Sequence, residues 1–159
     1  MRIYVPLTVA GLAALHTTGR ITPAPVAAHA VTPALRHGWA DADDEELEYA
    51  VLMAAAYDSL LLIADSHGEP RRIVVAADVD DALVTAGDDE TAVTVSSEVG
   101  ISQCTAVHID DADAEGEIVL ALERLPDAIA GDGQALGAVS LTEHELMWFA
   151  TQEIPDLLH

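Results

Sequence analysis

The chain has no lysine and no asparagine, and its 159 residues hold six arginines against 28 acidic side chains. The formal net charge is therefore −22 at pH 7. Direct binding to nucleic acid needs many Lys and Arg contacts to phosphate, so this composition excludes it. The same charge repels anionic lipid headgroups, which excludes a membrane surface as a partner. Codons for Lys and Asn are rich in adenine, so a GC-rich coding sequence explains part of the imbalance, but it does not explain the scarcity of Arg.

Cysteine is nearly absent as well, since Cys104 is the one thiol in the chain. A single cysteine cannot form an internal disulfide, which is typical of a protein from a reducing compartment. Its neighbourhood in the sequence offers His108 as a base but no cationic group, so we expect a buried, inert thiol. No apolar run approaches the roughly 18 residues of a membrane-spanning helix. We therefore expect a cytoplasmic protein.

Several motifs of known chemistry are missing too. The sequence has no phosphate-binding loop, no dinucleotide fingerprint and no nucleophile elbow. The lack of Lys also argues against a phosphoacceptor pocket of the receiver type. What the chain does have is apolar residues, 51% of the total, which separates it from disordered acidic proteins. Its length suits one domain over residues 1–159.

The acidic residues are unevenly distributed, because the first forty residues contain none of the 28. Segments buried on both faces of a sheet leave no room for carboxylates, so we interpret this neutral start as buried strand and helix. The acids of the remainder gather at predicted turns and helix starts. A negative charge in the first turn of a helix stabilises it by roughly 0.3 to 1 kcal/mol, so much of the acidity needs no ligand.

Hydrophobic periodicity predicts an α/β fold, with α+β as the alternative. The predicted order is strand, helix, strand, helix, helix, strand, strand, strand, helix, helix. The strands fall at about 2–5, 26–31, 73–77, 92–97 and 105–109, and the helices at about 9–18, 33–38, 43–68, 111–125 and 142–154. Helical connections predict parallel pairing for the first three strands, and the last two are expected to pair antiparallel. The sequence thus predicts a single mixed sheet of about five strands with helices packed on it. A glycine-rich stretch at 127–140 is predicted to be a mobile loop.

Several segments carry a resemblance to a known family: residues 1–6, 30–35, 46–50, 72–79, 107–112 and 145–153. Together they resemble an uncharacterised family of short acidic actinobacterial proteins, known only as a domain of unknown function. The resemblance spans nearly the full length. It implies a bacterial, cytoplasmic, complete single-domain chain, and it implies no activity, cofactor or site residue.

Carboxylates follow two of the predicted strands. Asp78 and Asp80 follow the strand at 73–77, while His108, Asp110 and Asp111 close the strand at 105–109. If the two strands are parallel neighbours, these groups meet where open α/β sheets bind ligands, and clustered oxygens suit Mg²⁺ or Ca²⁺. The simpler interpretation is that Asp110 or Asp111 caps the next helix, that the others are solvated, and that no cofactor is bound.

The predicted last helix carries a second candidate site. A spacing of four places His144, Trp148 and Gln152 along one side of that helix, where they could form a partner surface. Alternatively, Trp148 packs in the interior and His144 is an ordinary surface residue. The zinc motif His-Glu-x-x-His is not present, because no second His follows His144-Glu145.

Two classes of function follow from these observations. The first is a non-catalytic interaction or regulatory module whose acidic face meets a basic protein. The alternative is a small metal-dependent enzyme or ligand-binding domain built on Asp78, Asp80, His108, Asp110 and Asp111. The second class requires Asp78 and Asp110 to share a pocket, so their separation distinguishes the two.

Overall fold

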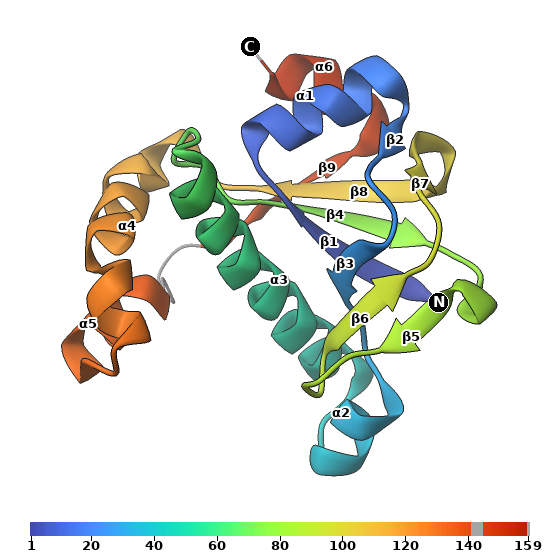
Figure 1. Ribbon diagram of the computed structural model, residues 1–159, viewed down its shortest axis with the longest axis horizontal. Helices are drawn as coiled ribbons and strands as arrows, with labels where there is room; N and C mark the ends of the chain where they lie inside the picture. The colour runs from blue at the N-terminus through green and yellow to red at the C-terminus, as the bar shows by residue number, and fades with distance from the viewer. Residues whose placement is uncertain (141–144, 159) are drawn as a thin grey trace.

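A seven-stranded sheet forms the centre of the computed structural model, which describes residues 1–140 and 145–158 (Figure 1). Its strand order is β5-β6-β3-β1-β4-β8-β9, and every neighbouring pair is antiparallel. The mixed class of helices packed on a sheet is confirmed. The expected parallel pairing of the first three strands is wrong, because β3 and β4 both run antiparallel to β1.

The strands of this sheet are β1 (Arg2–Leu7), β3 (Val26–His29), β4 (Ile73–Asp78), β5 (Val84–Ala86), β6 (Ala92–Val95), β8 (Cys104–Ile109) and β9 (Met147–Ala150). A separate two-stranded sheet joins β2 (Arg20–Ile21) to β7 (Val99–Gly100). The helices are α1 (Val9–Thr18), α2 (Pro33–Gly38), α3 (Asp44–Ser66), α4 (Glu115–Ile129), α5 (Gly133–Ser140) and α6 (Ile154–Leu157). Short 3₁₀ turns are η1 (Asp81–Leu83), η2 (Ile101–Gln103), η3 (Ala112–Ala114) and η4 (Thr151–Glu153).

The first three helices begin and end where local sequence signals place them. Thr8, Thr32 and Asp43 each accept a backbone N–H three residues ahead, which satisfies a donor that the first helical turn leaves open. Gly19 ends α1 in the left-handed region at φ 76°, a conformation that costs glycine little. His67 ends α3 at φ 53°. These predicted boundaries are confirmed to within a residue or two.

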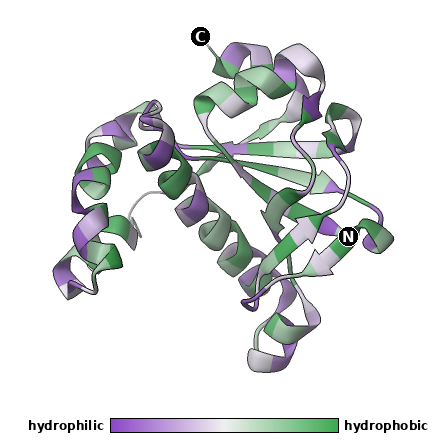
Figure 2. Cartoon of the chain, in the orientation of Figure 1, coloured by the Kyte–Doolittle hydropathy of each residue, from purple (hydrophilic) through white to green (hydrophobic). Residues whose placement is uncertain are grey.

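Alternation along β1 sorts its side chains between two cores. Ile3 and Val5 face the layer that contains α1 and α6, whereas Tyr4 faces α3 on the opposite side of the sheet. A third cluster joins α4 and α5 to the C-terminal half of α3 through residues such as Leu60 and Ile118. In Figure 1 these two helices stand to one side of α3, and Figure 2 shows the central strands coloured largely hydrophobic.

The stretch at 127–140 is not the predicted mobile loop. Helix α4 continues through Pro126 to Ile129, and α5 follows after a short turn. Asp132 begins α5 by accepting the backbone N–H groups of Gln134 and Ala135. Apolar side chains of α5, such as Val139, are buried against the cluster that α4 and α3 form. Burial of this face outweighs the low helix propensity of glycine.

The predicted last helix and the predicted strand pair are also corrected. Met147–Ala150 is strand β9, which pairs with β8 so that His108 lies opposite Trp148. From residue 145 to residue 158, only Ile154–Leu157 is α-helical, and the expected cap at Thr142 lies outside the described residues. Strands β6 and β8 do not pair with each other: β6 lies between β3 and β5, and β8 lies between β4 and β9.

Helix α3 is the one described helix that is long and apolar enough, by length and composition alone, to cross a membrane. The helix that covers a sheet in a globular core has the same composition. Here α3 buries Val51, Ala55 and Leu60 within the cores of the domain.

Candidate functional site

Asp78 and Asp110 lie at opposite ends of the sheet. Strands β4 and β8 are antiparallel, with Ile73 opposite Ile109 and Ala77 opposite Cys104. Asp110 therefore lies beside the start of β4, while Asp78 is its last residue. Asp110 lies opposite Arg72, six residues before Asp78, so a rise of about 3.3 Å per residue separates the two positions by roughly 20 Å. They do not share a pocket, so the geometry that the metal prediction requires is not formed.

Each acid of that predicted set has a local structural contact instead. Asp78 binds the Arg2 guanidinium with Nε–Oδ1 and Nη2–Oδ2 distances of 2.8 and 3.0 Å, and this hydrogen bonding lowers the pKa of Asp78. Asp80 and Asp111 cap η1 and η3 by accepting the N–H groups of Ala82 and Asp113. Asp111 thus caps the 3₁₀ turn that leads into α4, whereas α4 itself begins at Glu115 without a side-chain cap.

His108 is also apart from the other members of the set. Its ring is half-buried on the α3 face of β8, 6.4 Å from the ring of Tyr4, and burial lowers its pKa. Within the described residues, no group of three or more His, Cys, Asp and Glu side chains is placed to hold a metal ion. The structure therefore does not assemble the five predicted ligands into one site.

Asp110 forms a buried ion pair with Arg72, which the sequence interpretation missed. Asp110 Oδ2 accepts hydrogen bonds from Arg72 Nε at 2.9 Å and from the Arg72 backbone N–H at 2.8 Å, and Oδ1 accepts from Nη2 at 2.8 Å. Arg72 comes directly before β4, and Asp110 comes directly after β8. Because antiparallel pairing places the start of one strand beside the end of the other, an antiparallel prediction for these two strands would have placed Arg72 next to Asp110.

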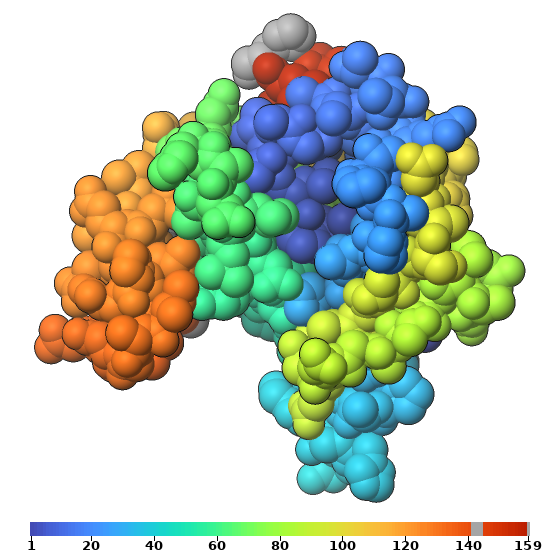
Figure 3. All heavy atoms as spheres, viewed as in Figure 1, coloured from blue at the N-terminus to red at the C-terminus, as the bar shows by residue number. Residues whose placement is uncertain are grey.

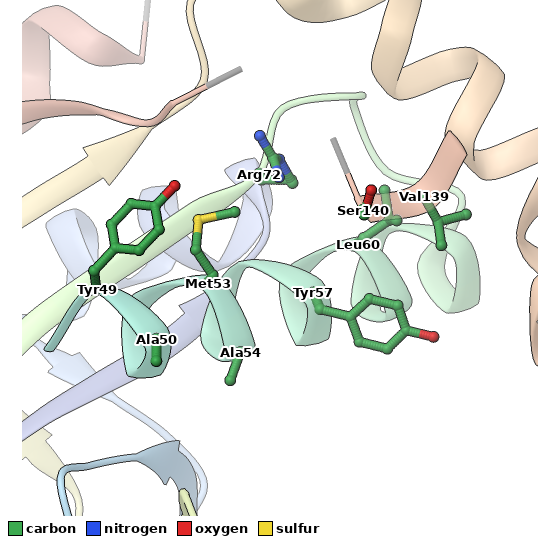
Figure 4. Close-up of a pocket in the computed structure, with 9 residues that line it drawn as sticks. All are labelled: Tyr49, Ala50, Met53, Ala54, Tyr57, Leu60, Arg72, Val139 and Ser140. Atoms are coloured by element: carbon green, nitrogen blue, oxygen red, sulfur yellow. The ribbon is translucent and has the colours of Figure 1, made fainter. Parts of the chain in front are cut away.

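A cavity of about 450 Å³ lies along α3 next to this pair (Figure 4). Tyr49, Met53 and Tyr57 form one wall at a spacing of four residues, and Arg72 and Ser140 lie across from them. The walls are mainly apolar and aromatic. Arg72 is the one charged side chain among the described residues that line this cavity, and it already binds Asp110. The described lining therefore offers no unpaired charged group for catalysis.

Cys104 is buried, as the sequence predicts. Burial raises the pKa of its thiol to about 11, and Sγ lies 3.6 Å from the carbonyl oxygen of Gly100. At neutral pH the thiol is protonated, which excludes it as a nucleophile.

The predicted partner surface of His144, Trp148 and Gln152 is described only in part. Trp148 is 61% exposed on β9, and Gln152 is exposed in η4. His144 lies outside the described residues. Helical spacing does not relate the other two, because Trp148 belongs to a strand.

A group of exposed acids lies on the segments next to α2 and at the start of α3, at the bottom of the view in Figure 1. We call this surface the acidic end, and it comprises Asp41, Asp43, Asp44, Glu45, Glu46, Glu48, Asp88, Asp89 and Glu90, all of them exposed. The turn at 87–90 belongs to it because a Cβ on Gly38 would come within 3.0 Å of Glu90 Oε1. Thr32 also donates a hydrogen bond to the Glu90 carbonyl. Trp39 lies within this surface and is 49% exposed.

Most carboxylates of the described residues have no structural role of their own. Of the 27 described acids, six cap a turn or helix and six others face an Arg, a His or the N-terminal amine, which leaves fifteen with neither contact. Four of the six Arg side chains are already in those pairs. The surface therefore carries a large excess of uncompensated negative charge.

The family model of DUF6912, a family of unknown function, matches residues 1–158. The chain belongs to this family. The expected resemblance to a domain of unknown function is thereby confirmed over residues 1–158. Comparison with curated proteins and with solved structures gave no match. Membership of DUF6912 thus assigns no activity to these residues.

Proposed function

We propose that this DUF6912 protein is an acidic interaction or regulatory module that binds a basic segment of another protein at its acidic end. One observation carries the proposal: nine exposed acids lie on the segments next to α2, whose end carries the exposed Trp39, and the Arg side chain among them, Arg36, is already paired with Asp44 at 2.8 Å. The proposal also places the protein in the cytoplasm, in keeping with its single buried thiol.

The chemistry of this surface favours Arg and Lys side chains. Clustered carboxylates produce a long-range field that accelerates encounter with a cationic partner, and the effect weakens with salt. An exposed indole adds a face on which a guanidinium can stack, worth about 0.5 to 1 kcal/mol at an exposed site. Trp39 therefore supplies the short-range contact that carboxylates alone do not provide.

Trp148 and Gln152 form a competing contact surface at the β9 edge of the sheet. Trp148 is the more exposed indole, but Glu145 is the one acid within three residues of it. For a cationic partner the acidic end is the better match.

The proposal is tested by titrating an arginine-rich peptide and a neutral peptide of equal length at low and high ionic strength. We expect binding of the arginine-rich peptide only, with affinity that falls steeply as salt rises. Tryptophan fluorescence in Trp39→Phe and Trp148→Phe variants identifies which indole reports the contact. A signal change that survives in Trp39→Phe and disappears in Trp148→Phe would move the site to β9.

A further inference from the structure

A second cavity, of about 430 Å³, opens on the other side of α3, between that helix, β1 and β3. We call it the β1–β3 cleft. In Figure 3 it is the hollow near the centre of the view, with dark-blue atoms of β1 at its floor between green α3 and the blue segment that leads into β3. It shares no lining residue with the acidic end or with the cavity beside Arg72.

The cleft exists because Pro6 interrupts the sheet. Strands β1 and β3 are paired only at Tyr4 and His29. The Ala30 N–H donates to Thr91 on the far side of β3, so His29 and Ala27 direct their backbone groups toward β1. The residue that should face Ala27 is Pro6, which has no N–H to donate. The two strands are not paired beyond this point, and Pro6 and Ala27 both line the cleft.

The side chains that line the cleft are apolar except for Asp58 and Thr22. Val5, Leu7, Leu61 and Leu62 supply much of the lining, and Asp58 is the one ionisable side chain among the lining residues. Asp58 is 42% exposed and its Oδ2 lies 2.5 Å from Nε2 of the buried His29. His29 is held in turn by Thr91, at 2.8 Å from Nδ1.

The hydrogen bonds from Thr91 to His29 and from His29 to Asp58 hold the Asp58 carboxylate in one position at the cleft. One oxygen is occupied by His29, while Oδ1 makes no hydrogen bond to any described residue. A mostly apolar pocket with a few convergent polar groups is the usual form of a small-molecule site. Here the polar side chains are those of Asp58, whose Oδ1 can accept a hydrogen bond, and Thr22.

We propose that the β1–β3 cleft binds a small apolar molecule that carries a protonated amine. The apolar body lies against Leu61 and Leu62, and the ammonium donates to Asp58 Oδ1. Charge complementarity selects this class, because the cleft has no cationic lining group and the protein carries −22, so a carboxylate or phosphate ligand is repelled. The site is independent of the acidic end and of any basic protein partner.

Octylammonium is a suitable probe, with octanoate, octanol and ethylammonium as controls. We expect calorimetry to show binding of octylammonium, binding at least about tenfold weaker for octanol and ethylammonium, and none for octanoate. Backbone amide shifts at Leu7, Ala27 and Leu62 should move in the same titration, which locates the site.

The variant pair is Asp58→Asn and Asp65→Asn. Asparagine keeps an acceptor for His29, and Asp65 is an exposed acid two turns further along α3 with no ion pair among the described residues. Asp58→Asn should weaken octylammonium binding about tenfold, and Asp65→Asn should leave it nearly unchanged. Equal loss in both variants, equal affinity for octanol, or amide shifts outside the cleft would overturn the proposal.

Discussion

The guanidinium of Arg72 binds the carboxylate of Asp110 through two hydrogen bonds, in a site where the two side chains are 2% and 1% exposed. Because Asp110 also accepts the backbone N–H of Arg72, the carboxylate joins the start of β4 to the end of β8. The residue that sequence patterns suggest as a metal ligand is thus a structural counter-ion.

Removing the Asp110 carboxylate should destabilise the fold strongly. Asp110→Ala leaves a buried guanidinium without its counter-ion, which costs about 3 to 5 kcal/mol of unfolding free energy. Asp111→Ala is the control, since it removes only the cap of η3 and should cost about 1 kcal/mol. Urea denaturation of both variants measures the difference. Similar values for the two would show that the buried pair does not support the sheet.

Ser59 should contribute more to the stability of the fold than its small side chain suggests. Its hydroxyl donates to the Leu7 carbonyl at 2.7 Å and accepts the Ile73 N–H at 3.0 Å, so it joins α3 to β1 and β4 in the core. Ser59→Ala leaves two buried backbone groups unsatisfied, and we expect a loss of about 2 kcal/mol in the free energy of unfolding. Ser66→Ala removes an exposed hydroxyl of the same helix and should cost much less. Denaturation midpoints compare the two.

His108 should make stability depend on pH in a predictable direction. Burial lowers its pKa in the folded protein, whereas the unfolded chain has the ordinary value of about 6.5. The unfolded state therefore binds the proton more readily, and the contribution of neutral His108 is lost as pH falls below about 6.5 toward the folded pKa. His108→Gln should show a shallower fall in unfolding free energy between neutral and mildly acidic pH. Parallel pH profiles for the two proteins would be evidence against this assignment.

Local signals could be predicted from the sequence, and strand partners could not. Thr8 and Asp43 mark helix starts because the hydrogen bonds that they make reach only three residues along the chain. The separation of Asp78 from Asp110 depends on the direction of β8 relative to β4, which no local pattern encodes. The apolar spacing around Trp148 predicts a helix, but Met147–Ala150 forms β9 instead, because it pairs with the edge of β8.

The β1–β3 cleft also could not be predicted, because it depends on which strands are neighbours in the sheet. The first strand is predicted at about 2–5, but β1 extends through Pro6 to Leu7, and Pro6 pairs with Val74 of β4. Its missing N–H affects only the neighbour at β3, and that neighbour is known only once the strand order is known. The acidic end, by contrast, could be predicted in part, since its α3 acids are contiguous in the sequence.

Trp39 should matter to binding and not to folding. Its indole is half-exposed at the end of α2, so Trp39→Ala should leave the denaturation midpoint nearly unchanged. The same change should weaken binding of an arginine-rich peptide about three- to fivefold, the equivalent of an exposed cation–π contact. Trp148→Ala is the matched control and should retain the affinity. Full affinity in Trp39→Ala would remove the indole from the proposed contact.

The most direct test of the acidic end compares two triple variants with the same change in net charge. Asp41→Asn, Glu48→Gln and Glu90→Gln neutralise acids of that surface, while Asp65→Asn, Glu123→Gln and Asp127→Asn neutralise acids elsewhere; none of the six is a cap or part of an ion pair among the described residues. We predict that the first triple variant binds an arginine-rich peptide about tenfold more weakly at low salt and that the second binds nearly as the parent does. Equal weakening in both would mean that only net charge attracts the peptide, and would contradict a binding site at the acidic end.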